Sequence, residues 1–105
     1  ELEKEFFKGI ILKIENTSEI IGSVRAYEED DRVYIGKLMV HPKYQNKGFG
    51  TNLLKTIETY YKDKTFELFT SNKSDKNIML YKRNGYKEFK RKKLSKELEL
   101  IYLEK

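Results

Sequence analysis

Two glycines in the middle of the chain have the spacing that most directly suggests chemistry. Gly48 and Gly50 end the run Gln-Asn-Lys-Gly-Phe-Gly, which starts at Gln45, and a helical pattern of apolar residues follows them. Unpaired backbone N–H groups at a helix start form an anion site, and glycine lets the backbone curve closely around a phosphate. Lys47 adds a positive charge within the turn. The run therefore predicts an anion-binding turn.

Two well-known phosphate loops do not fit this turn. The nucleotide P-loop ends in Gly-Lys-Ser/Thr, whereas this turn ends in Phe49-Gly50-Thr51. The dinucleotide fingerprint needs a third glycine three residues after the second, and Leu53 occupies that position. The pattern that remains is Gln-x-x-Gly-x-Gly after a strand ending in Val40-His41-Pro42. Taken alone, it also fits an ordinary strand-to-helix turn.

The elements that position the turn can be predicted from hydrophobic periodicity. Strands are expected at 9–15, 20–28 and 33–40, and the short turns between them indicate an antiparallel meander. Apolar residues then recur at helical spacing over 50–62, and 65–70 alternates as a fourth strand. A strand, a helix and a strand in this order form a crossover, so the third and fourth strands should be parallel.

The rest of the chain is predicted to contain a short helix and a hairpin. Ser74 is expected to be the N-cap of the helix and Gly85 to end it. Strands at 86–92 and 98–103 then form the hairpin. We expect a single α/β domain over residues 1–105, with antiparallel strands at both ends and one crossover in the middle.

Composition narrows the function classes. The chain has 105 residues and no cysteine, which excludes disulfides, a cysteine nucleophile and thiolate metal sites, and its single histidine argues against a histidine-built metal site. No apolar stretch is long enough to cross a bilayer and no signal peptide is recognisable, so a cytoplasmic protein is expected. The net charge of +5 favours an anionic partner, namely nucleic acid, a membrane or a polyphosphate cofactor, and equally fits a lysine-rich surface.

Two segments together resemble a known family. Leu38-Met39-Val40-His41-Pro42, then Gln45-x-x-Gly48-x-Gly50 and a helix with paired leucines, resemble the acetyl-CoA-binding segment of the GNAT superfamily of N-acetyltransferases. The run from Asn77 to Tyr86 resembles the family's other signature, in which a tyrosine is followed by a helix end with glycine and an aromatic residue. Here these are Tyr81 and Gly85-Tyr86. The resemblance extends from about Gly9 to the C-terminus. It implies a GNAT-like acyl-CoA N-acyltransferase fold and transfer of an acetyl group from acetyl-CoA to a primary amine by direct attack, without a metal.

The resemblance also assigns the cofactor contacts. The backbone of Met39 and Val40 would pair with the pantetheine arm, and an N–H there would polarise the thioester carbonyl. Tyr81 matches the family's general acid, which protonates the leaving thiolate, although a tyrosine here also fits a core aromatic. Asn77 would contact the pantetheine amides or the phosphate region, and Ser74 stands where many members carry a cofactor-contacting Asn. The turn that would hold the pyrophosphate comprises Gln45, Asn46, Lys47, Gly48, Phe49, Gly50 and Thr51.

The general base is where the chain departs from the family. Many members carry a Glu where this chain has Gly36. Glu28 and a water chain are alternatives, and Glu28 equally fits a solvated turn carboxylate. His41 is expected to be structural, capping the strand, and Lys76 is a candidate for contact with a CoA phosphate. The family's N-terminal helices and first strand are lacking, which fits a missing start, and residues 1–8 are expected to be a helix end or a disordered lead-in.

Two other functions fit the sequence. The lack of the base and of the N-terminal helices favours a GNAT-like module that binds acyl-CoA without turnover. The basic run around Phe89 favours a nucleic-acid-binding domain, although such runs are usually solvated hairpin faces. A small amine, an antibiotic, a peptide N-terminus and a protein lysine stay open as acceptors. A homodimer is also expected through an exposed C-terminal edge at 101–103.

Overall fold

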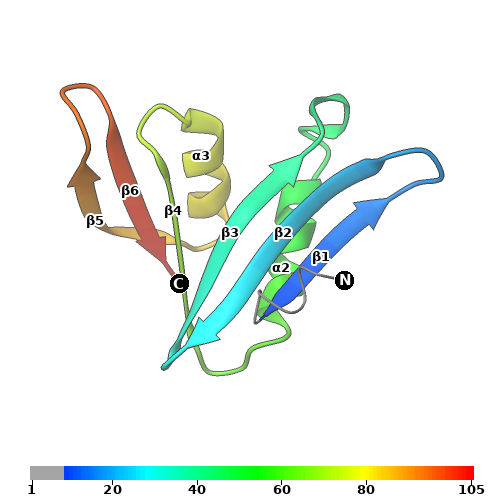
Figure 1. The fold of residues 1–105 in the computed structure, drawn as a ribbon, viewed down its shortest axis with the longest axis horizontal. Helices are drawn as coiled ribbons and strands as arrows, with labels where there is room; N and C mark the ends of the chain where they lie inside the picture. Colours follow the sequence, from blue (N-terminus) through cyan, green and yellow to red (C-terminus); the bar gives the residue numbers. More distant parts are fainter. Residues whose placement is uncertain (1–8) are drawn as a thin grey trace.

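A six-stranded sheet is the framework of the protein, which a computed structural model describes over residues 9–105 (Figure 1). The strand order is β1-β2-β3-β4-β6-β5. The strands are β1 (Ile10–Glu15), β2 (Ile20–Glu29), β3 (Arg32–Val40), β4 (Thr65–Ser71), β5 (Lys87–Lys93) and β6 (Glu99–Glu104). A 3-10 helix, η1 (Pro42–Tyr44), precedes α2 (Phe49–Glu58), and α3 (Asp75–Arg83) follows β4. The N-terminal lead-in predicted for residues 1–8 lies outside the described residues.

The first three strands form the antiparallel meander that the sequence predicts. The turn between β1 and β2 is held by Asn16, whose side-chain oxygen accepts hydrogen bonds from the N–H groups of Ser18 and Glu19. Near its end β3 is irregular, because Lys37 has a φ of 52° and the register with β2 shifts nearby. Such an irregularity turns the last residues of a strand away from the regular sheet.

β3 and β4 are parallel, as the predicted crossover requires, but they pair over a short distance only. The pairing joins Arg32–Tyr34 to Thr65–Glu67. At this paired end the Arg32 guanidinium contacts carboxylates on two other strands, Glu67 at 2.9 Å and Glu104 at 2.6 Å. Beyond it the two strands diverge toward their carboxyl ends (Figure 1). The sheet therefore contains a split between its two central strands.

Both helices pack against one face of the sheet and share one hydrophobic core. α2 contributes Leu53, Leu54 and Ile57, and α3 contributes Tyr81. α2 is shorter than the predicted 50–62, because the Thr59 hydroxyl donates to the carbonyl of Thr56 at 2.6 Å and the helix ends there.

None of the helices within residues 9–105 has the length and apolar character that a membrane crossing requires.

The ends of α3 agree only in part with expectation. Gly85 follows the helix with a φ of 94°, the left-handed conformation that glycine adopts readily. Ser74 is the N-cap residue, as predicted, but its side chain makes no capping hydrogen bond. Its backbone carbonyl accepts from Ile78 instead, so the helix starts without a side-chain cap.

The C-terminal hairpin forms, but the predicted exposed edge is wrong. β6 lies between β4 and β5, with Leu103 opposite Leu68, so Ile101 and Leu103 are buried in the core. The edge strand on this side of the sheet is β5, and all of its residues are exposed. Lysine on an edge strand discourages pairing with another chain. The basic residues of this edge are Lys87, Lys90, Arg91, Lys92 and Lys93.

A buried hydroxyl ties the C-terminus to α2. The Tyr86 hydroxyl donates to Glu58 at 2.7 Å, and Lys105 contacts the other carboxylate oxygen at 3.0 Å. Burial and this hydrogen bond raise the pKa of Tyr86. Tyr86→Phe is expected to lower the free energy of unfolding by about 1–3 kcal/mol, because a hydrogen bond to a charged group is lost. Urea unfolding measures this, with Tyr60→Phe in the exposed turn after α2 as the control, and equal values for both variants would contradict it.

Candidate functional site

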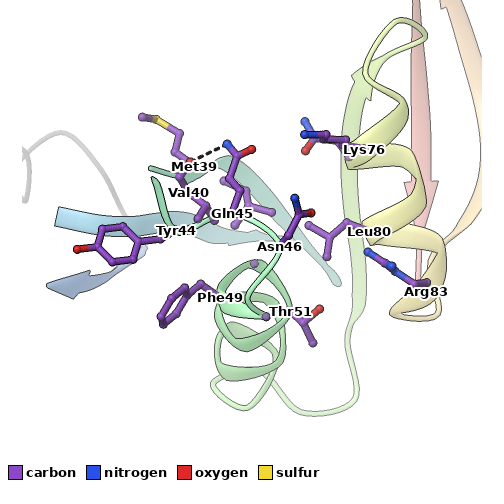
Figure 2. Close-up of a pocket in the computed structure, with 14 residues that line it drawn as sticks. Met39, Val40, Tyr44, Gln45, Asn46, Phe49, Thr51, Lys76, Leu80 and Arg83 are labelled. Carbon is purple, nitrogen blue, oxygen red and sulfur yellow. Dashed lines mark hydrogen bonds between the residues drawn. The ribbon is translucent and has the colours of Figure 1, made fainter. Parts of the chain in front are cut away.

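A pocket of about 770 Å³ lies where β3 ends, and its size is typical of sites for small ligands (Figure 2). Three segments form it: the end of β3, the turn that leads into α2, and one face of α3. The lining residues are Leu38, Met39, Val40, Tyr44, Gln45, Asn46, Gly48, Phe49, Gly50, Thr51, Lys76, Asn77, Leu80 and Arg83.

The floor of this pocket carries a series of free backbone donors. The N–H groups of residues 46–51 donate no hydrogen bond to any described residue, and the first helical bond after them joins the Asn52 N–H to the Gly48 carbonyl at 3.0 Å. Asn46 and Gly48 have φ values of 63° and 85°. Such alternation turns successive N–H groups to one side and forms an anion-binding concavity. With no acidic residue in the first turn of α2, the positive end of the helix dipole adds to this site.

The segment between β3 and the turn is held in place by side chains. The ring Nδ1 of His41 accepts from the Lys43 N–H at 3.1 Å, so His41 caps η1 rather than the strand that the sequence predicted it to cap. The Tyr44 hydroxyl donates to Glu19 at 2.9 Å, which attaches this segment to the turn between β1 and β2. A Cβ on Gly50 would lie 3.0 Å from the Leu80 side chain, so α2 and α3 approach closely at this point. These contacts therefore fix the position of the turn between β3 and α2.

The end of β3 presents its backbone to the pocket. The His41 N–H donates to the Ile21 carbonyl on β2 at 2.7 Å. Because neighbouring residues in a strand direct their N–H and C=O groups to opposite sides, those of Val40 point away from β2 and into the split. The Val40 carbonyl accepts a hydrogen bond from the Gln45 side chain at 3.0 Å (Figure 2). β4 is not paired there, so the Val40 N–H faces the pocket.

The face of α3 that lines the pocket carries two cations, Lys76 and Arg83, with Leu80 between them (Figure 2). Neither cation forms an ion pair with a carboxylate in residues 9–105. The sequence reasoning named Lys76 but missed Arg83. The spacing of the two residues could have indicated Arg83, since residues seven apart lie on one face of a helix. Also missed were Leu38, Tyr44 and Leu80.

The structure brings most of the predicted cofactor residues together. Of these, Met39, Val40, Gln45, Asn46, Gly48, Phe49, Gly50, Thr51 and Asn77 line the pocket. Lys47 does not line it, although its backbone N–H belongs to the free series. Ser74 does not line it either. The first residues of α3 that do are Lys76 and Asn77.

Tyr81 lies behind the pocket rather than in its wall. Its side chain is 5% exposed and its ring packs on Tyr86 at 6.2 Å between centroids. Burial raises the pKa of Tyr81 to about 12. No described residue forms a hydrogen bond with its hydroxyl, and no fully buried side-chain oxygen of the described chain lacks a partner. The Tyr81 oxygen therefore keeps contact with solvent and remains free to donate a proton.

The candidate base Glu28 lies elsewhere. It pairs with Lys64 at 2.7 Å, next to the turn where β3 begins, whereas the pocket lies where β3 ends. Gly36 leaves its side-chain position empty, with no atom within 4 Å of where a Cβ would be. No carboxylate lines the described pocket.

Comparison with known proteins agrees with this geometry. An acetyltransferase from Bacillus cereus superposes with a TM-score of 0.81 at 25% identity, covering 93% of this chain and 72% of that one. A GNAT family acetyltransferase from Elizabethkingia anophelis, solved with acetyl-CoA bound, gives 0.78 at 23% identity and covers 98% and 79%. The ribosomal-protein-S18-alanine N-acetyltransferase of Escherichia coli gives 0.78 at 18% identity and covers 97% and 74%. These matches confirm the predicted GNAT-like fold.

The sequence comparisons lead to the family itself. No curated protein matches the chain by sequence. The sequence model of the acetyltransferase (GNAT) family, however, matches residues 2–86, which is most of the chain. Together with the superpositions, this match shows that the chain belongs to the acetyltransferase (GNAT) family.

Proposed function

We propose that this protein is an acetyl-CoA-dependent N-acetyltransferase that moves an acetyl group from the CoA thioester to a primary amine. The observation that carries the proposal is the series of free N–H groups at 46–51, next to the Val40 backbone in the split. A diphosphate fits the first feature, and an extended arm with amide groups fits the second. The related fold from Elizabethkingia anophelis has acetyl-CoA bound.

Different lining residues would bind different parts of the cofactor. In this proposal the N–H groups of residues 46–51 hold the pyrophosphate, and Lys76 neutralises part of its charge. The backbone of Val40 pairs with the pantetheine arm like a short extra strand, after the Gln45 side chain releases the Val40 carbonyl. The backbone groups of Met39 point toward β2 instead, so the pairing expected for Met39 is left out, although Met39 lines the pocket. Asn77 contacts the arm from α3. Ser74, which lies outside the pocket, is left out of this contact set.

The chemistry is a direct displacement at the thioester. The amine nitrogen attacks the carbonyl carbon, the carbon–sulfur bond breaks, and the amine's extra proton passes to solvent. Negative charge develops on the carbonyl oxygen, where the Val40 N–H stabilises it. The departing thiolate takes a proton from Tyr81, which regains one from solvent, and its raised pKa keeps Tyr81 protonated at neutral pH before the next turnover.

Acetyl-CoA binding is the first test of this proposal. Acetyl-CoA at about a hundredfold excess over its Kd should stabilise the fold by about 2.7 kcal/mol and raise Tm by several degrees. A panel of amines with detection of free thiol then measures turnover. A Tm that does not move with acetyl-CoA would refute the proposal.

A module that binds acyl-CoA without turnover is the second candidate. The observation that favours it is the lack of a carboxylate among the described pocket residues, since the chain then offers no side-chain base. The same panel separates the two functions. Thermal stabilisation without thiol release from any amine favours the binding module, whereas thiol release excludes it.

The homodimer and the cytoplasmic location stay predictions.

A further inference from the structure

Arg83 is a pocket cation that neither the glycine turn nor the transfer chemistry uses. It lines the pocket from the last turn of α3, and its side chain is exposed. It has no ion pair with a described carboxylate, and no carboxylate lines the pocket. A guanidinium without a protein partner beside an anion site is available to a ligand phosphate, which it binds with two parallel hydrogen bonds.

The neighbouring residue fixes where Arg83 lies along the pocket. The Asn84 side chain donates to the Thr51 hydroxyl at 3.3 Å and to the Leu80 carbonyl at 2.8 Å. Because Thr51 is the last residue of the free N–H series, this bridge places the end of α3 beside the end of that series. Figure 2 shows Arg83 on this side of the pocket and Lys76 at the opposite end of the same helix face.

The pocket therefore has an order of groups along its length. The Val40 backbone comes first, the N–H groups of 46–51 follow, and Arg83 lies beyond them. Seven residues of helix, about 10 Å, separate Arg83 from Lys76. Coenzyme A has a matching order of thioester and pantetheine, pyrophosphate, and then a ribose that carries a separate 3′-phosphate.

We propose that Arg83 binds the ribose 3′-phosphate and makes the protein selective for 3′-phosphorylated CoA thioesters over their dephospho forms. This inference rests on the proposed function, because it takes the thioester to lie at Val40. The 3′-phosphate carries two charges that the backbone series, occupied by the pyrophosphate, does not neutralise. The guanidinium is the described pocket cation at that end of the site.

The test compares the Kd of acetyl-CoA with that of acetyl-dephospho-CoA by titration calorimetry. The wild-type protein should prefer acetyl-CoA about tenfold, the low end for a charge-assisted hydrogen bond at an exposed site. Arg83→Gln should lose that preference by weakening acetyl-CoA alone, with the dephospho form unchanged. Arg83→Lys should retain part of it, since the charge remains.

Lys82→Gln is the matched control, because Lys82 is the neighbouring exposed cation on α3 and does not line the pocket. It should keep the full preference. Equal wild-type affinity for the two thioesters would overturn the inference, and so would an Arg83→Gln variant that weakens both forms alike. Failure of the wild-type protein to bind either thioester would instead refute the proposed function.

Discussion

Tyr81→Phe is expected to lower turnover by about a hundredfold or more, while the affinity for acetyl-CoA changes little. The variant removes one oxygen from a side chain that does not line the pocket, so cofactor binding should survive. The thiolate then leaves without a proton donor, which slows breakage of the carbon–sulfur bond. Steady-state thiol release measures turnover, and calorimetry measures the Kd.

The hydroxyl of Tyr81 has no protein partner among the described residues, so its loss should affect stability less than its loss from Tyr86 does. Tyr60→Phe is the control, because Tyr60 is exposed in the turn after α2 and should keep full activity. Unchanged turnover in Tyr81→Phe would remove Tyr81 from the mechanism. A loss of turnover together with unfolding would assign it to the core instead.

The pH dependence of turnover provides a second readout for Tyr81. Burial disfavours the phenolate and raises the pKa of Tyr81 to about 12. The acid therefore stays protonated at neutral and moderately alkaline pH, and its contribution is lost only as the pH rises through the raised value. A fall in turnover centred near the ordinary tyrosine pKa of about 10 would contradict this assignment.

Gly48→Val is expected to weaken acetyl-CoA binding by about tenfold or more and to destabilise the fold by about 1–2 kcal/mol, the cost of a left-handed backbone with a Cβ. Gly48 has a φ of 85°, which a β-branched residue avoids. The turn should relax toward negative φ and rotate the N–H groups out of their common direction. Calorimetric titration well below Tm measures binding apart from unfolding.

Gly36→Val is the matched control for this change. Gly36 lies in β3, has no positive φ, and leaves open space where a Cβ would be. Valine suits a strand there, so stability should not fall and acetyl-CoA affinity should stay near the wild-type value. Wild-type affinity in Gly48→Val would show that the free N–H series does not hold the cofactor.

The local elements could be predicted because each depends on residues close together in sequence. Alternating apolar residues indicate β2 and β4, the helical spacing of Leu53, Leu54 and Ile57 indicates α2, and short turns indicate the meander. The parallel pairing of β3 and β4 follows from the handed crossover between them. The glycine turn belongs to this local class too, since positive φ at Gly48 is a property of one residue.

The contacts between distant segments could not be predicted in this way. The burial of Ile101 depends on β6 pairing with β4 about thirty residues earlier. The alternation of apolar residues in the hairpin does not indicate which other strand β6 will pair with. Glu28 was a candidate base in the sequence, yet it pairs with Lys64 next to the opposite end of β3. Only long-range pairing decides which titratable groups reach the pocket.

By itself the sequence determined the strand–turn–helix setting of residues 45–50 and a likeness to a family that uses acetyl-CoA, and it predicted that this turn binds an anion. These depend on local backbone conformation and on motifs with fixed spacing. Only the tertiary structure decided that β3 and β4 separate beside this turn, that Arg83 lines the pocket formed there, and that Tyr81 is buried outside the pocket lining. The physical reason is that the packing of two helices on one split sheet sets which faces meet. The free energy of that packing comes from contacts between residues far apart in the chain, which no local pattern contains.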